Sequence, residues 1–165
     1  MKLLVAISQT PETTARIAFK DGGTAFDPSG VNFIMNPYDE WYALVRALEL
    51  KEEKGGSVTV IHCGPLANEV TIRKALAIGA DDAIRVDMEP DSAYAVAQQI
   101  AAHATTAGYD IIFTGKETID YNGSLVAGMV AGLLNLPFIS HASKMVFSGD
   151  KAIVTRDIEG GTEEI

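Results

Sequence analysis

The sequence predicts an α/β fold: a doubly wound, mostly parallel sheet with helices on both faces. Four short apolar runs lie at residues 3–7, 58–63, 81–86 and 110–115. They are continuous and do not alternate with polar residues, as expected of strands that are covered on both faces. Helical patterns separate the runs, and such alternation implies right-handed crossovers between parallel strands.

The composition fits one soluble domain spanning residues 1–165. The hydrophobic fraction of 47% and the charged fraction of 21% are ordinary for a soluble protein. The net charge of −9 argues against nonspecific binding to nucleic acid or to anionic membranes. No apolar run reaches the length of a membrane span. The single Cys63 excludes an internal disulfide and suits a reducing compartment, so we expect a cytoplasmic protein.

The first helix is expected in "NPYDEWYALVRALELKEEKG". Asn36 suits the N-cap and Pro37 the first helical position, while Gly55 ends the helix. Helical periodicity predicts one apolar stripe, made of Trp41, Leu44, Val45 and Leu48.

Three further helices are expected along the chain. In the second, "NEVTIRKALAIGA", the side chains of Ile72, Ala75 and Leu76 are expected to face the core. This helix should end at Gly79 in the left-handed conformation. "DSAYAVAQQIAAHATTAG" opens on Asp91 or Ser92 and closes at Gly108. "NGSLVAGMVAGLLN" is short, rich in glycine and alanine, and starts at the pair of residues 123–124.

Two regions depart from strand–helix alternation. Residues 20–33 look like an irregular excursion between the first strand and the first helix. "SKMVFSGDKAIVTRD" places two strand-like runs around Gly149-Asp150, which predicts a C-terminal hairpin. The final "EGGTEEI" is typical of a chain interrupted before its next element, so a fragment of a longer chain is expected.

A ligand crevice is expected where the strand order reverses, at the carboxyl ends of the strands. If the strands follow the common order 3-2-1-4-5, the runs ending at Ile7 and Gly115 are neighbours at that reversal. A helix starting at Gly123 and Ser124 would offer free amides to a phosphate, and Lys116 would add a charge-assisted contact. Four segments then converge on one edge: Ala6 to Gln9, Asn36 to Asp39, Cys63 to Pro65, and Gly115 to Ser124.

Each of these features also has an ordinary structural explanation. A Gly-Ser pair before a helix is more often simple capping, and Asn36-Pro37 likewise. Asp120 either caps the helix or binds a ribose hydroxyl. Cys63 is expected to be a small buried hydrophobe, and the three histidines show neither metal-ligand spacing nor a catalytic triad. Only the convergence of the four segments favours a Rossmann-like fold that binds a nucleotide.

Signatures of nucleotide-dependent enzymes are missing from the chain. Neither G-x-G-x-x-G after a strand nor G-x-x-x-x-G-K-[ST] occurs. We therefore expect a bound nucleotide to be held and not hydrolysed, with no catalytic residue and no metal site.

Several stretches together resemble the beta subunit of electron transfer flavoprotein. They are "LLVAISQTPET", "MNPYDEWYALVRALELKE", "VTVIHCGPLANEVTIRKALAIGADDAIRV", "YDIIFTGKETIDYNG" and "DIEGGTEEI". The similarity runs from the first residue to the last. The order of the motifs M-N-P-[FY]-[DC]-E, C-G-P, A-[ML]-[AG]-x-G-A-D and G-K-x-x-I-D is far more specific than any one of them.

This resemblance implies an electron carrier and not an enzyme. The family's beta subunit forms a heterodimer with an alpha subunit, which holds most of the redox-active FAD. Electrons would pass from dehydrogenases such as acyl-CoA dehydrogenase to a quinone reductase. The beta subunit itself buries AMP, or a second FAD in flavin-bifurcating relatives.

The resemblance also implies a set of ligand-contacting positions in this chain. By motif they are Ala6, Asn36, Pro37, Tyr38, Asp39, Cys63, Gly115, Lys116, Ile119, Asp120, Asn122, Gly123, Ser124, Leu125 and Val126.

The chain departs from the family in two places. After Gly115-Lys116 many members read I-D-D-D-C-N-Q-T, whereas this chain has apolar Leu125 and Val126, so Ser124 is the best remaining hydroxyl donor. The family also continues past "EGGTEEI" with more of its sheet region, a loop that recognises dehydrogenases and an arm that embraces the alpha subunit.

Two other functions stay open on the residues alone. One is a free-standing adenine-nucleotide-binding module of the universal-stress type, although Gly115 and Gly123-Ser124 have the wrong spacing for its G-x-x-G-x(9)-G-[ST] motif. The other is a nucleotide hydrolase, for which no phosphate-activating loop is present.

Overall fold

The centre of the molecule is a four-stranded parallel sheet. A computed structural model describes all 165 residues. The sheet has the order β7-β6-β1-β8 and consists of β1 (Lys2–Ala6), β6 (Ser57–Cys63), β7 (Asp82–Val86) and β8 (Ile111–Phe113). β1 pairs in parallel with both β6 and β8. The predicted fold class, the four strands and the reversal of strand order between β1 and β8 are therefore confirmed.

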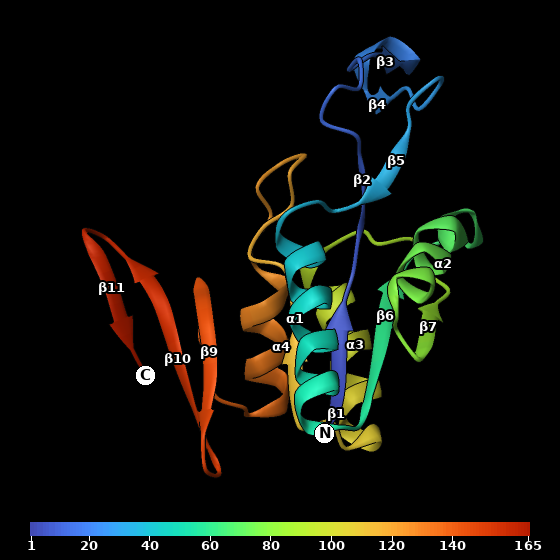
Figure 1. Ribbon diagram of the computed structural model, residues 1–165. Coiled ribbons are helices and arrows are strands. Elements are labelled where there is room, and N and C mark those ends of the chain that lie inside the picture. The colour runs from blue at the N-terminus through green and yellow to red at the C-terminus, as the bar shows by residue number, and fades with distance from the viewer.

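Helices cover both faces of this sheet (Figure 1). α1 (Asp39–Lys54) and α2 (Glu69–Ile78) pack on one face, and α3 (Ala93–Ala107) and α4 (Val126–Leu134) on the other. Alternate residues of β1 supply the two cores, since Leu3 and Val5 face α1 while Leu4 and Ala6 face α3. A 3-10 turn, η2 (Leu66–Asn68), precedes α2. None of the helices combines the length and the apolar composition needed to cross a membrane.

The start of α1 differs from the prediction. The helix begins at Asp39, and its N-cap position is Tyr38, which has a φ of 63°. Asn36 is buried and makes no helix cap, because its side chain bonds a distant loop. The end at Gly55, with a φ of 73°, is confirmed.

The buried face of α1 also differs from the predicted stripe. Trp41 is 45% exposed. The positions that face the sheet start instead at the preceding residue, Glu40, and repeat at the i, i+3, i+4 spacing of a helix. Two alanines on this face let the helix approach the sheet closely. The buried residues are Glu40, Ala43, Leu44, Ala47 and Leu50.

The other helix boundaries match the sequence in part. Ser92 caps α3 by accepting a hydrogen bond from the Ala95 amide, and Gly108 ends that helix in the left-handed conformation, as predicted. α2 ends at Gly79, but with a φ of 141° and not in the left-handed helical region. Leu76 is exposed and does not point inward. α4 starts at Val126, two residues after the predicted Ser124, because the preceding loop is closed by hydrogen bonds of its own.

The excursion after β1 contains two small antiparallel pairs. β2 (Gln9–Pro11) pairs with β5 (Phe33–Met35), and β3 (Phe19–Lys20) pairs with β4 (Ala25–Phe26) around a 3-10 turn, η1 (Asp21–Gly23). This arm extends from the carboxyl end of the central sheet, at the top of Figure 1. The region is irregular, as predicted, but β2 carries residues of the candidate site.

The C-terminal part forms a separate antiparallel sheet. β9 (Ala142–Ser148) and β10 (Lys151–Ile158) make the predicted hairpin, with Gly149 in the turn at a φ of 64°. A second turn at Gly160 leads into β11 (Gly161–Glu164), a strand that the sequence did not predict. The sheet has the order β11-β10-β9 and stands beside the helices, at the left of Figure 1.

Candidate functional site

A cavity of about 340 Å³ opens at the carboxyl ends of β1, β6 and β8. It is bounded by the turn after β1, the end of β6, the start of α3 and the loop between β8 and α4. Ligand sites of α/β sheets lie at such a reversal of strand order. Eight of the predicted site residues line it: Ala6, Cys63, Gly115, Lys116, Asp120, Gly123, Ser124 and Val126.

The other predicted site residues lie outside the cavity wall: Asn36, Pro37, Tyr38, Asp39, Ile119, Asn122 and Leu125. Two of them hold the β8–α4 loop in place. The amide of Asn36 donates to the Glu117 carbonyl at 2.9 Å and accepts from the Ile119 amide at 3.2 Å. The carboxylate of Asp39 accepts from the Glu117 amide at 3.0 Å. Asn36 and the first residue of α1 thus shape the cavity indirectly, by holding the β8–α4 loop in place.

Pro37 and Tyr38 line a second hollow of about 350 Å³ on the outer side of α1. Trp41 and Tyr42 complete its aromatic wall and are exposed. Trp41 therefore does not pack in the core, as its place in the predicted apolar stripe had implied.

Glu40 is a cavity residue that the sequence analysis missed. It is buried, and its two carboxylate oxygens accept from Ser8, from the amide at 2.5 Å and from the hydroxyl at 2.7 Å. Burial raises the pKa of Glu40 to about 7, against the opposing effect of these hydrogen bonds. The available signal was its position in the i, i+3, i+4 pattern that includes Ala43, Leu44 and Ala47.

The loop after β8 contains hydrogen bonds between its own residues. Thr118 accepts from the Asn122 amide at 2.9 Å and, through its hydroxyl, from the Gly123 amide at 3.1 Å. The expected free amide at Gly123 is therefore occupied. The amides of Gly115, Lys116, Ser124 and Leu125 make no hydrogen bond within the protein.

Ser124 and Leu125 directly precede α4, and Gly115 and Lys116 line the same cavity as Ser124. The first turn of a helix leaves its own amides without intrahelical partners, and its dipole favours a negative charge there. Gly115 also needs to be glycine, because a Cβ would lie 2.7 Å from the Glu40 Cγ and 3.2 Å from the Asp39 Cβ. This side of the cavity can therefore bind an anionic group through main-chain donors.

The charged side chains of the loop are partly engaged. Lys116 pairs with Glu117 at 3.1 Å, and this contact raises the pKa of the lysine and lowers that of the glutamate. Asp120 accepts from the Tyr121 amide at 3.0 Å and does not cap α4. Lys116 is 43% exposed at its side chain, so an anion would meet a cation already neutralised by its neighbour.

The end of β6 supplies a neutral wall. His62 is buried, and its ring nitrogens contact the Ile7 carbonyl and the Asn68 amide, both at 2.9 Å. Burial lowers the pKa of His62 and raises that of the Cys63 thiol to about 11. A neutral thiol is no nucleophile, which agrees with the predicted packing role. No group of three His, Cys, Asp or Glu side chains is arranged to hold a metal ion.

The sheet order and the cavity at its reversal define a doubly wound α/β protein. A family model described as "Electron transfer flavoprotein domain" matches residues 24–165. The chain is 34% identical to electron transfer flavoprotein subunit beta of Bacillus subtilis and 37% identical to that of Thermoanaerobacterium thermosaccharolyticum. The human subunit is 35% identical. The chain belongs to the electron transfer flavoprotein family.

The alignments to these three relatives cover the whole chain. The chain in turn spans 65% of the Bacillus subtilis protein, 64% of the Thermoanaerobacterium protein and 67% of the human one. The matched part includes the central sheet, the cavity and the antiparallel sheet.

Proposed function

We propose that this chain is the nucleotide-binding part of an electron transfer flavoprotein beta subunit. The observation that carries the proposal is the set of unpaired main-chain amides at the reversal of strand order, from Gly115, Lys116 and Ser124 into the first turn of α4. Such donors suit a phosphate, even in a chain whose net charge is −9. Family membership supports this function over a module of the universal-stress type.

The ligand proposed for the cavity is AMP, or a second FAD whose adenylate half lies in the same place. The amides after β8 would hold the phosphate, and Ser124 would add a hydroxyl. Asn36 and Asp39 would contribute by fixing the loop, since both bond its backbone. Ala6 and Cys63 would bound the base or ribose through apolar contact.

The redox role is proposed for the complex and not for this chain alone. An alpha subunit would hold most of the electron-carrying FAD, and that FAD supplies the redox chemistry when bound. The complex would accept electrons from dehydrogenases, such as those acting on acyl-CoA, and deliver them to a quinone reductase. In this chain no residue needs to move a proton, which agrees with a histidine and a cysteine held neutral in the cavity wall.

A purification experiment tests this function. The chain is prepared alone and together with the alpha subunit of a relative, and the small molecules released by denaturation are weighed by mass spectrometry. We expect AMP or FAD from the chain alone, and a flavin absorption band that increases in the complex. Recovery of neither nucleotide from either preparation would contradict the proposal.

A pair of variants assigns the nucleotide to this cavity. Gly123→Val introduces a Cβ 2.4 Å from the Tyr121 ring, which must then move within the loop. We expect lower nucleotide occupancy in this variant. Gly132→Ala in α4 is the control, because a Cβ there meets no atom within 4 Å. Equal occupancy in both variants would contradict the position of the site.

A further inference from the structure

Glu40 places a buried carboxyl group beside the candidate anion site. The residue belongs to the first turn of α1, is 7% exposed and lines the cavity. Both of its carboxylate oxygens are bonded by Ser8, one by the amide and one by the hydroxyl. These two bonds hold the carboxyl group at the turn after β1, away from bulk water.

The side chain of Glu40 also packs against the loop that offers free amides. A Cβ on Gly115 would lie 2.7 Å from the Glu40 Cγ and 3.4 Å from the Glu40 amide nitrogen. The amides of Gly115 and Lys116 make no hydrogen bond within the protein. A phosphate bound by these amides would therefore come close to the Glu40 side chain.

A phosphate and an ionised carboxylate repel each other, most strongly where water is scarce. No lysine or arginine forms an ion pair with Glu40, and the nearby Lys116 is already paired with Glu117. A proton on Glu40 would remove the repulsion. Burial already raises the pKa of this carboxyl group to about 7, so protonation requires little free energy near neutral pH.

We propose that binding of a nucleotide phosphate in this cavity is coupled to the uptake of one proton from solvent by Glu40. The proton would stay on the carboxyl group and be donated to the Ser8 hydroxyl oxygen, while the Ser8 amide keeps its own bond. No bond of the ligand forms or breaks. The inference rests on the proposed function and adds to it a way in which pH regulates nucleotide binding.

Other charged and titratable groups surround Glu40 in the cavity and its walls. They are Asp39 of α1, His62 and Cys63 of β6, Asp91 before α3, Lys116, Glu117 and Asp120 of the β8–α4 loop, and His141 and Asp157 beyond that loop. Burial keeps His62 and Cys63 neutral, because it lowers the pKa of the first and raises that of the second to about 11. The contact between Lys116 and Glu117 raises the pKa of the lysine and lowers that of the glutamate, so this pair stays charged.

The test is calorimetric titration of the 165-residue chain after removal of bound nucleotide. Titrations at pH 7.5 in two buffers with different ionisation enthalpies count the protons taken up, because the buffer supplies them. The probes are AMP, FAD and adenosine, which lacks a phosphate. A phosphate monoester loses its second proton near about pH 6, so AMP itself exchanges few protons under these conditions.

Two variants assign the proton to a residue. Glu40→Gln keeps the shape of the side chain and can still accept from the Ser8 amide, but it cannot take up a proton at these pH values. Asp91→Asn is the matched control, since it removes the charge of an exposed acid that lines the same cavity.

We expect the wild type to take up about 0.5–1 proton per nucleotide at pH 7.5, where most Glu40 of the free chain is ionised. Adenosine should bring almost no uptake. The affinity of the wild type for the nucleotide should fall by about 5- to 8-fold from pH 7.5 to pH 8.5, because the proton becomes scarcer. In Glu40→Gln the uptake should vanish and the affinity should stay within about twofold over this range. Asp91→Asn should keep the uptake of the wild type.

Three results would overturn the inference while leaving the proposed function intact. They are nucleotide binding to the wild type with less than about 0.2 proton taken up, equal uptake in Glu40→Gln, or equal uptake with adenosine. The first and third need no variant, so they decide the matter even if Glu40→Gln fails to fold. Failure of the wild-type chain to bind AMP or FAD would instead remove the proposed function and this inference with it.

Discussion

The central parallel sheet and the C-terminal antiparallel sheet differ in how far their residues are buried. In β1 and β6 nearly every residue is buried, because helices cover both faces. In β9, β10 and β11 only Val154 is buried, and Val146 and Ile158 are among the exposed apolar side chains. The fold and the candidate site therefore depend on the parallel sheet, while the antiparallel sheet is attached to its side.

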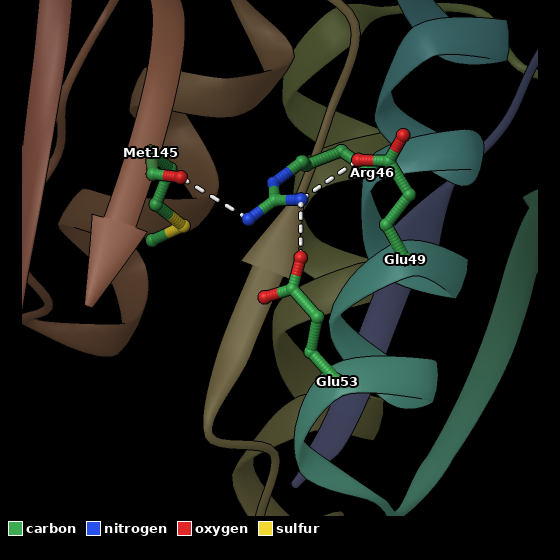
Figure 2. A network of polar contacts seen from close by, with 4 residues as sticks. All are labelled: Arg46, Glu49, Glu53 and Met145. Carbon is green, nitrogen blue, oxygen red and sulfur yellow. Dashed lines mark hydrogen bonds and ion pairs between the residues drawn. The ribbon is translucent and has the colours of Figure 1, made fainter.

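A small number of contacts makes that attachment. Arg46 of α1 donates to the Met145 carbonyl of β9 at 3.1 Å and pairs with Glu49 at 2.7 Å and with Glu53 at 3.5 Å (Figure 2). The Lys54 ammonium lies 5.5 Å from the centre of the Phe147 ring. Met145 and Phe147 are partly buried against the core beneath α1. The antiparallel sheet thus has no buried cluster of its own, and β9 packs against α1 and the edge of its core.

The largest expected effect is a difference in unfolding free energy between a substitution beside the parallel sheet and one in the antiparallel sheet. Leu44→Ala removes a fully buried side chain between α1 and the parallel sheet and should cost about 3 kcal/mol of unfolding free energy. Val146→Ala in β9 is the matched change at a 42% exposed position and should cost less than about 1 kcal/mol. Urea unfolding measures both, and similar losses would show that the antiparallel sheet is as tightly packed as the parallel one.

The second prediction concerns pH. The pKa of Glu40 is raised by burial to about 7 in the folded chain, from an ordinary value near 4.5. Between these values the unfolded chain loses this proton while the folded chain keeps it, so stability falls as pH rises and levels off above about 7. The difference between these two pKa values corresponds to roughly 3 kcal/mol of stability.

The variant Glu40→Gln should remove that dependence. Its carbonyl can accept from the Ser8 amide and its NH₂ can donate to the Ser8 hydroxyl, so the contacts of the carboxylate have replacements. We expect the variant to be more stable than the wild type at pH 8 and to differ less from it at pH 5, by urea unfolding at each pH. Asp91→Asn, at an exposed acid that also lines the cavity, is the control. Parallel pH profiles for wild type and Glu40→Gln would contradict the raised pKa.

The third effect is smaller and lies within the site. Gly115→Ala forces a Cβ against Glu40 and Asp39 at the start of α1 and should cost about 1–3 kcal/mol. Gly132→Ala, in open space within α4, should be neutral or slightly stabilising because alanine favours the helix. Thermal melts compare the two, and an equally stable Gly115→Ala would show that the β8 loop yields without strain.

The smallest effect tests the attachment of the antiparallel sheet. Arg46→Ala removes the bond to the Met145 carbonyl and two partly exposed ion pairs, for a loss of about 0.5–1 kcal/mol. Hydrogen exchange should speed up in β9 and β10 and stay unchanged in β1 and β6. Arg73→Ala, which breaks an exposed pair with Glu69, is the control. Faster exchange throughout the chain would mean that both sheets unfold as one unit.

Much of the fold could be predicted because it depends on local patterns. Continuous apolar runs marked the four strands, Ser92 and Gly108 marked the ends of α3, and Gly149 marked the hairpin turn. β11 was not predicted, because its four mostly polar residues show no strand periodicity. The strand is defined only by its backbone hydrogen bonds to β10.

The sequence by itself determined the class of fold and the four strands of the parallel sheet, because these follow from hydrophobic period and chain connectivity. The structure supplied the strand order, which the sequence analysis had only assumed. Only the tertiary structure decided what the polar residues at that edge do. Asn36 bonds a loop 81 residues away instead of capping its own helix, Glu40 is buried against Ser8, and Thr10 is left unpaired. Hydrogen bonds between residues so far apart in the chain leave no periodic trace in the sequence, since either partner alone looks like an ordinary polar residue.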